Sequence, residues 1–119
     1  MLTAEQKRKL DTYFGFARKE KGVYAGMMLE EKLERRKVSL LIFLPSCSEK
    51  AKNQLTRLAE NTDDIVLLDY QGDYPVNLSC GYEMLKAVGI KDPNLSKAIY
   101  KTLSEDVTVS ESQKKEETI

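Results

Sequence analysis

The chain has 119 residues, of which 41% are hydrophobic and 32% are charged, and its 19 basic and 19 acidic side chains give a net charge of zero. This length and composition fit one domain with one buried core, and they exclude wholesale disorder and a strongly basic nucleic-acid binder. The absence of histidine excludes histidine-type zinc sites and histidine-based catalytic triads.

Other features of the sequence narrow the class of protein. No apolar run approaches the roughly 20 residues of a membrane span. The first ten residues have no apolar core of the kind found in signal peptides. The two isolated cysteines, Cys47 and Cys80, form no disulfide framework. We therefore expect a cytoplasmic protein with no membrane contact.

The zero net charge hides an uneven distribution along the chain. Residues 1–103 carry 17 basic and 14 acidic side chains, whereas residues 104–119 carry two basic and five acidic ones. The last 16 residues also show no hydrophobic periodicity. This pattern predicts a mildly basic domain over residues 1–103, followed by a disordered acidic tail over residues 104–119.

The first two elements are predicted from caps and spacing. Thr3 and Gln6 form a capping-box pattern, and the apolar residues that follow are spaced as on one face of a helix from Thr3 to Lys19. The dipeptide Lys21-Gly22 predicts a turn, and Val23-Tyr24 predicts a short strand.

An amphipathic helix and a buried strand come next. Met28, Leu29 and Leu33 mark the apolar face of the helix, and charged residues up to Lys37 fill its other face, with the basic ones expected in the last turn. The nearly continuous apolar run Val38–Leu44 is typical of a strand buried on both faces of a sheet.

The pattern then repeats. Ser46 and Glu49 form a second capping-box pattern ahead of a helix that ends near Asn61. The run Ile65–Leu68 predicts a second buried strand.

Residues 69–77 are rich in turn formers and predict a loop, residues 78–85 a short helix, and residues 87–90 a strand. Asp92 and Pro93 form an N-cap and a first helical position, from which the last helix runs to Leu103. The alternation of helices and strands predicts an α/β fold with helices on both faces of a central sheet.

The sequence offers little for catalysis. It contains no glycine-rich phosphate-binding loop. The pair Asp63-Asp64 is a solvated turn or a metal site, and we favour the turn. Cys47 is expected in the first turn of a helix, where its pKa would fall, but it has no histidine partner, so we favour a structural thiol. We expect no enzyme, no cofactor, no metal and no small-molecule substrate.

A basic cluster around the second helix is more informative. Seven basic residues outnumber four acidic ones there, and Gly26 opens the helix. Backbone amides at a helix start bind phosphate, and neighbouring Lys or Arg adds positive charge. The alternative is an ordinary solvated helix with internal ion pairs such as Glu31–Arg35, and from these residues alone we favour it.

Four stretches together resemble one known family. They are Phe16–Gly26, Leu33–Ile42, the serine-capped Ser46–Lys50, and Val88–Ile99. In order and spacing they are similar to the kink-turn-binding ribosomal protein superfamily, which includes large-subunit proteins seven-Ae and thirty-e and their small bacterial relatives. The resemblance covers roughly residues 8 to 103.

The resemblance implies a three-layer α/β/α sandwich around a four-stranded mixed sheet. It also implies RNA binding by an edge made of the start of the second helix and the loop between the last strand and the last helix. The family reads the RNA there with an Asn and a Glu, whereas this chain has Met27, Met28 and Leu29 in the matching stretch. Apolar side chains cannot make those base-edge hydrogen bonds.

We therefore predict RNA binding connected with the ribosome or translation, through phosphate and shape contacts and with a degenerate recognition motif. The expected RNA-binding residues are Lys21, Gly26, Met27, Met28, Lys32, Arg35, Arg36, Lys37 and Lys91. The alternative is a protein-interaction module that uses the same edge, centred on Met27 and Met28, with RNA binding lost.

Overall fold

The structure, a computed structural model, describes residues 1–107 and confirms the predicted order of elements. Helices and strands alternate along the chain as α1 (Ala4–Lys19), β1 (Val23–Tyr24), α2 (Gly26–Glu34), β2 (Leu40–Phe43), α3 (Glu49–Ala59), β3 (Val66–Asp69), α4 (Val76–Ser79), β4 (Ala87–Ile90) and α5 (Pro93–Val107).

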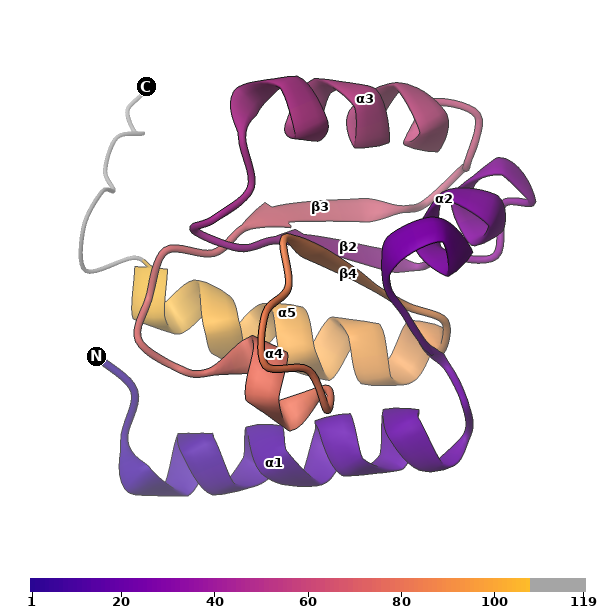
Figure 1. Ribbon diagram of the computed structural model, residues 1–119. Helices are drawn as coiled ribbons and strands as arrows, with labels where there is room; N and C mark the ends of the chain where they lie inside the picture. Colours follow the sequence, from indigo (N-terminus) through magenta and orange to yellow (C-terminus); the bar gives the residue numbers. More distant parts are fainter. Residues whose placement is uncertain (108–119) are drawn as a thin grey trace, which may run out of the picture.

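The strands form one mixed sheet in the order β1-β4-β2-β3. Strands β2 and β3 are parallel, and β4 is antiparallel to both β1 and β2. Helices α2 and α3 cover one face of the sheet, and α1, α4 and α5 cover the other (Figure 1). The predicted three-layer α/β/α sandwich with a four-stranded mixed sheet is confirmed.

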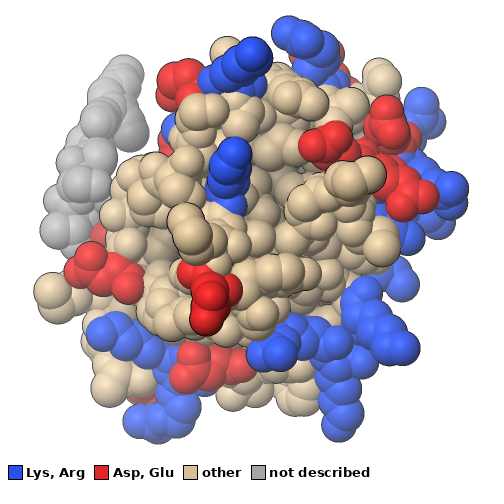
Figure 2. Space-filling model, viewed as in Figure 1, with Lys and Arg blue, Asp and Glu red and all other residues tan. Residues whose placement is uncertain are grey.

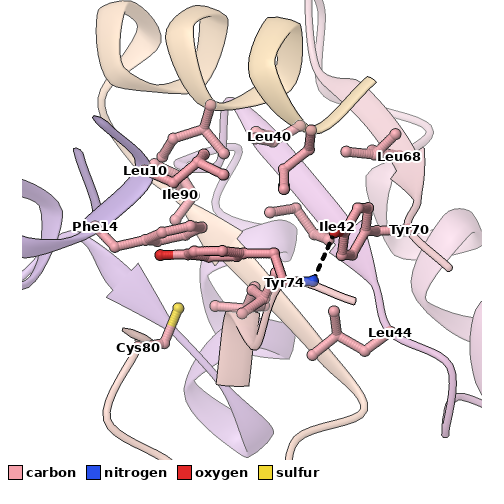
Figure 3. Close-up of a cluster of buried hydrophobic side chains, with 14 of the residues drawn as sticks. Leu10, Phe14, Leu40, Ile42, Leu44, Leu68, Tyr70, Tyr74, Cys80 and Ile90 are labelled. Atoms are coloured by element: carbon pink, nitrogen blue, oxygen red, sulfur yellow. Dashed lines mark hydrogen bonds between the residues drawn. The ribbon is translucent and has the colours of Figure 1, made fainter. Parts of the chain in front are cut away.

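Each face of the sheet has its own core. On one face, Leu10 and Phe14 of α1 and Ile99 of α5 pack against Ile42 and Ile90 of the sheet (Figure 3). The other core is formed by side chains of α2, α3 and the sheet, namely Leu29, Leu33, Leu41, Phe43 and Leu55. Successive side chains of β2 point to opposite faces of the sheet. Because a core covers each face, this strand is buried throughout, as its apolar run predicts.

The prediction of a second fully buried strand is wrong. Strand β3 lies at the edge of the sheet, and Val66 and Leu67 are 38% and 40% exposed. Only Leu68 of this strand is buried. An apolar run of four residues does not distinguish a central strand from an edge strand, because strand order is set by contacts distant in sequence.

The predicted helix caps hold at two of three sites. Thr3 and Gln6 form the full capping box of α1, and the Asp92 carboxylate accepts hydrogen bonds from the backbone amides of Asn94 and Leu95. Helix α3 is capped by Ser48, whose hydroxyl accepts from the Ala51 amide, and not by Ser46. Ser46 instead donates to the Leu85 carbonyl and joins the loop before β4. The short helix α4 lies earlier than predicted.

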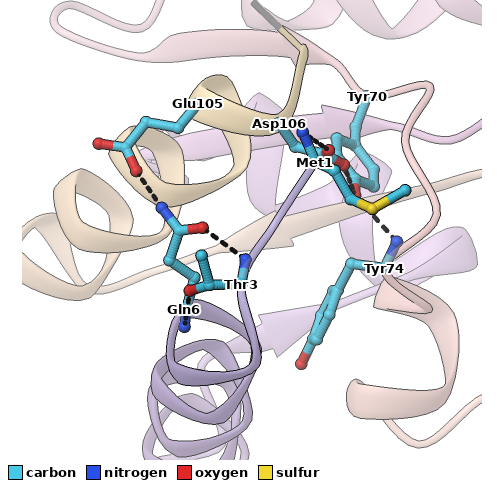
Figure 4. A network of polar contacts seen from close by, with 7 residues as sticks. All are labelled: Met1, Thr3, Gln6, Tyr70, Tyr74, Glu105 and Asp106. Atoms are coloured by element: carbon cyan, nitrogen blue, oxygen red, sulfur yellow. Dashed lines mark hydrogen bonds and ion pairs between the residues drawn. The ribbon is translucent and has the colours of Figure 1, made fainter. Parts of the chain in front are cut away.

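The last helix is longer than predicted and passes the expected end at Leu103. Helix α5 continues to Val107, and the Asp106 carboxylate accepts a 2.7 Å hydrogen bond from the Tyr70 hydroxyl (Figure 4). The same hydroxyl accepts from the Tyr74 amide, and Gln6 donates to Glu105. These contacts fix the end of α5 against α1 and the loop after β3. The remaining residues of the predicted tail, 108–119, lie outside the described part of the chain.

Candidate nucleic-acid interface

Helix α2 begins with an open, uncapped turn. Gly26 has φ of +61°, a left-handed conformation in which glycine is unstrained, and a Cβ there would meet no atom within 4 Å. Ala25 occupies the N-cap position and provides no side-chain hydrogen bond. The sequence therefore selects glycine for backbone conformation, and it leaves the first amides of α2 without a side-chain cap.

Exposed methionines surround this helix start. Met27 is 88% exposed and Met28 49% exposed, and Met84, from the loop before β4, is 84% exposed. Met84 and Lys86 line a hollow of about 640 Å³ together with Gly26. We call Gly26, Met27, Met28, Met84 and Lys86 the helix-start edge. Its dominant chemistry is apolar.

The structure corrects the predicted partner of this edge. The resemblance placed the loop between the last strand and the last helix, with Lys91, beside the start of the second helix. Because β4 is antiparallel to β1, the segment that comes before β4 lies there instead. The Lys91 amide donates to the Gly22 carbonyl, at the opposite end of the strand pair.

Two of the predicted basic residues already have partners in the protein. The Arg35 guanidinium forms an ion pair with Glu31 at 3.3 Å, as the spacing of the two residues predicts. The Lys32 ammonium lies 5.4 Å from the centroid of the Tyr24 ring, within cation–π range. The positive charges of Arg35 and Lys32 therefore already interact with groups of the protein itself, which leaves less of each charge available to a ligand.

The end of α2 differs from the prediction. The helix ends at Glu34, so Arg35, Arg36 and Lys37 follow it and do not form its last turn. Arg36 has φ of +60°, its amide donates to the Leu33 carbonyl, and the Lys37 amide donates to the Lys32 carbonyl. This is a Schellman motif with arginine in the position that glycine usually takes.

Helix α1 ends in the same way. Lys21 has φ of +59°, its amide donates to the Arg18 carbonyl, and the Gly22 amide donates to the Ala17 carbonyl. Lys21 and Arg36 thus both hold a left-handed backbone conformation that costs a side-chain-bearing residue about 1 kcal/mol. At both positions the charge is kept at the expense of local stability.

Three of the predicted residues do come together. Arg36, Lys37 and Lys91 line a hollow of about 860 Å³, where β2 and β3 begin and β4 leads into α5. We call this the strand-start hollow. Lys97 of α5 also lines it, and sequence reasoning missed this residue because only the tertiary fold brings the first turns of α5 beside the end of α2.

In the part of the chain that the structure describes, these four cations have no carboxylate partner. Within residues 1–107, none of them lies within 4.0 Å of a carboxylate oxygen, although Asp63 and Asp64 line the same hollow. Lys21 likewise forms no ion pair with any of the described residues, and it adjoins Gly22, where a Cβ would lie 3.2 Å from that of Lys91. The predicted site is therefore divided into an apolar helix-start edge and a cationic strand-start hollow.

The space-filling view shows how charge is distributed on one face of the molecule. Figure 2 shows a largely uncharged centre on this face of the molecule, with Lys, Arg, Asp and Glu interleaved at the right, over α2. Further basic side chains gather below, near the junction of α1 and α2 (Figure 2). No charge of one sign covers the whole face.

The two cysteines have the properties of structural thiols. Cys47 precedes α3 and is buried, and desolvation raises the pKa of its thiol, so the lowered pKa expected from a position in the first helical turn is wrong. Burial raises the pKa of Cys80 to about 12. Among the described residues no group of three His, Cys, Asp or Glu side chains is placed to hold a metal ion.

Comparison with known proteins adds evidence on the fold. No family model and no curated protein matches the sequence. Among solved structures, a protein of unknown function from Bacillus halodurans superimposes with a TM-score of 0.65 at 15% identity, covering 81% of this chain and 97% of that one.

The Giardia lamblia 15.5kD RNA binding protein superimposes with a TM-score of 0.57 at 10% identity, covering 92% of this chain and 93% of that one. At these identities the likeness establishes the fold alone, and it is the α/β fold expected from the resemblance to proteins seven-Ae and thirty-e. Within residues 1–107, no helix is long and apolar enough to cross a membrane.

Proposed function

We propose that this protein is a cytoplasmic RNA-binding protein, and not an enzyme, that contacts RNA phosphates with Lys21, Arg36, Lys37 and Lys91. The observation that carries the proposal is the gathering, at one end of the sheet, of cations that have no carboxylate partner among residues 1–107. The similarity of the fold to an RNA binding protein of Giardia supports it.

The proposed mode of binding is recognition of phosphates and shape. The exposed side chains at the helix start, Met27 and Met28, have no donors or acceptors for base edges beyond a weakly accepting thioether. A structured RNA presents phosphates in a fixed geometry that cations on a rigid fold can match. That the RNA is a kink-turn, or belongs to the translation machinery, is proposed from the sequence resemblance alone.

The test is a titration of fluorescently labelled RNA at 50 and 200 mM salt. Four phosphate contacts on a duplex-like RNA predict a loss of affinity of about 150-fold between these concentrations. The double variant Lys37→Glu/Lys91→Glu removes two contacts and lowers the slope of log K against log salt by about two. A kink-turn RNA and a matched duplex without G·A pairs report whether the kink is recognised.

Two further variants separate charge from folding. Lys7→Glu/Lys50→Glu makes the same change in net charge at exposed sites away from the hollow and is expected to retain RNA binding. Arg36→Gly removes one cation and relieves a left-handed arginine, so RNA affinity falls while thermal stability rises. Unchanged affinity in both Arg36→Gly and Lys37→Glu/Lys91→Glu would refute the assignment of this surface.

A second candidate function is docking of a protein partner on the helix-start edge. Met27 and Met84 are each more than 80% exposed, and methionine suits an adaptable apolar contact. The variant Met27→Ser/Met84→Ser distinguishes the two candidates. It leaves RNA affinity unchanged if the cations carry binding, and a large loss would show that this edge contacts RNA.

A further inference from the structure

The strand-start hollow contains polar groups that have no hydrogen-bond partner among residues 1–107. The Ser96 hydroxyl, on a residue only 4% exposed, has no hydrogen-bond partner within the described residues, and neither has the Thr62 hydroxyl. Both residues line the hollow. Buried hydroxyls are nearly always hydrogen-bonded in folded proteins, so these two hydroxyls at a single hollow are available to hydrogen-bond a bound group.

The charges around the hollow indicate the nature of that group. Four cations and the two carboxylates of Asp63 and Asp64 line it, which leaves an excess of two positive charges. A phosphate monoester carries close to two negative charges at neutral pH and has three strongly accepting oxygens. It therefore balances the excess charge and supplies acceptors for the hydroxyl and ammonium donors.

The rest of the lining suits the organic part of such a ligand. Tyr100 of α5, a residue that is 39% exposed, lines the hollow, and Val38, Ile65 and Pro93 add apolar surface. An exposed aromatic face next to cations is a platform for stacking of a base. The Asp63 and Asp64 carboxylates are acceptors for ribose hydroxyls or exocyclic amines.

We propose that the strand-start hollow binds a nucleoside monophosphate group, with its phosphate monoester held by Lys91, Lys97 and the Ser96 hydroxyl and its base against Tyr100. The group has two sources, a free mononucleotide or the phosphorylated 5′ end of an RNA strand. The proposal shares Lys91 with the proposed RNA contact, but Ser96, Lys97 and Tyr100 belong to the nucleotide site alone.

The first experiment is isothermal titration calorimetry of the full chain with AMP, GMP, CMP and UMP. Adenosine, ribose 5-phosphate and inorganic phosphate are the comparison probes. At least one mononucleotide is expected to bind at least about tenfold more tightly than each of these, because each probe lacks the base or the phosphate. Equal binding of inorganic phosphate and every mononucleotide would overturn the nucleotide assignment.

Three variants test the residues. Ser96→Ala is expected to weaken mononucleotide binding at least about fivefold, and it leaves the thermal midpoint unchanged or raised because it removes an unpartnered buried hydroxyl. Lys97→Glu is expected to abolish binding, whereas Lys101→Glu, one turn later on α5 and outside the hollow, retains it. Tyr100→Leu tests the stacking platform. Wild-type affinity in both Ser96→Ala and Lys97→Glu would refute the proposed site.

The RNA source is tested with one single-stranded hexamer that carries either a 5′-phosphate or a 5′-hydroxyl. If the protein prefers the hexamer with the 5′-phosphate and the Ser96→Ala variant loses this preference, the ligand is an RNA terminus. If the protein binds mononucleotides without this preference, the ligand is a free nucleotide. If the protein binds RNA but shows neither mononucleotide binding nor a preference for the 5′-phosphate, this inference is overturned and the proposed function stands. Mononucleotide binding without any RNA binding overturns the proposed function and supports the inference.

Discussion

The Tyr70 hydroxyl is the best point at which to test how the end of α5 is held. It donates to the Asp106 carboxylate at 2.7 Å and accepts from the Tyr74 amide at 2.9 Å. Tyr70 is 1% exposed, and the Asp106 side chain is 11% exposed. The variant Tyr70→Phe removes this one oxygen atom and leaves a buried carboxylate oxygen and a buried amide without these partners.

The expected cost follows from those two losses. A hydrogen bond to a charged group contributes about 1.5 to 3 kcal/mol, and a buried amide left unpaired costs about 1 to 3 kcal/mol. The Met1 amino group, 3.6 Å from the other Asp106 oxygen, offsets part of the loss. We therefore expect Tyr70→Phe to lower the free energy of unfolding by about 3 kcal/mol, a large fraction of the total for a domain of this size.

Urea unfolding followed by far-ultraviolet circular dichroism measures this change. With a denaturant slope of about 1.5 kcal/mol per molar, the midpoint is expected to fall by about 2 M. Tyr82→Phe is the matched control, because Tyr82 is 41% exposed and its hydroxyl forms no hydrogen bond within residues 1–107. A double-mutant cycle with Asp106→Ala isolates the Tyr70–Asp106 coupling. A loss below about 0.5 kcal/mol in Tyr70→Phe would refute the role given to this contact.

Two further predictions concern stability. Burial is the main cause that raises the pKa values of Tyr70 and Tyr74, so the folded state keeps protons that the unfolded state releases above about pH 10. The stability that these two tyrosines contribute is therefore fully present below pH 10 and falls above it, by up to about 2.7 kcal/mol per pH unit for the two groups together. Urea unfolding at pH 9, 10 and 11 measures this slope, and an equal slope in Tyr70→Phe/Tyr74→Phe would contradict the assignment. A Cβ at Gly89 would lie 2.6 Å from Leu29 Cδ1 and 3.1 Å from Val38 Cγ1, so Gly89→Ala is expected to cost about 2 kcal/mol by overpacking α2 against β4. Gly15→Ala, with no atom within 4 Å, is the control and is expected to gain about 0.5 to 1 kcal/mol in thermal unfolding; a gain in both variants would contradict the packing argument.

The sequence predicts the elements well where the signals are local. The caps at Thr3 and Asp92 and the apolar run of β2 depend on residues within a few positions of one another, and the structure confirms them. The ends of α1 and α2 are harder to predict from the sequence, because Lys21 and Arg36 occupy positions where a glycine would have indicated the helix end. The extension of α5 was missed because its partner Tyr70 lies 36 residues away in sequence.

The candidate site could be predicted only in part for the same reason. The basic residues around α2 are evident from composition, but their separation from Met27 depends on where the helix ends and on the antiparallel pairing of β1 with β4. That pairing brings Met84 and Lys86 to the start of α2 and takes Lys91 to the opposite end. Periodicity in one segment contains no information about either choice.

The division of the site is compatible with the proposed binding of RNA by a chain of zero net charge. Binding depends on the local potential where phosphate lies, and paired charges such as Arg35 and Glu31 contribute little to it. Glycine would be less strained than Arg36 and Lys21 at these two positions, so the backbone conformation does not account for the two cations. Retaining two cations at strained helix ends next to Lys37 and Lys91 therefore favours a ligand that interacts with them, and the apolar helix-start edge remains available for a different contact.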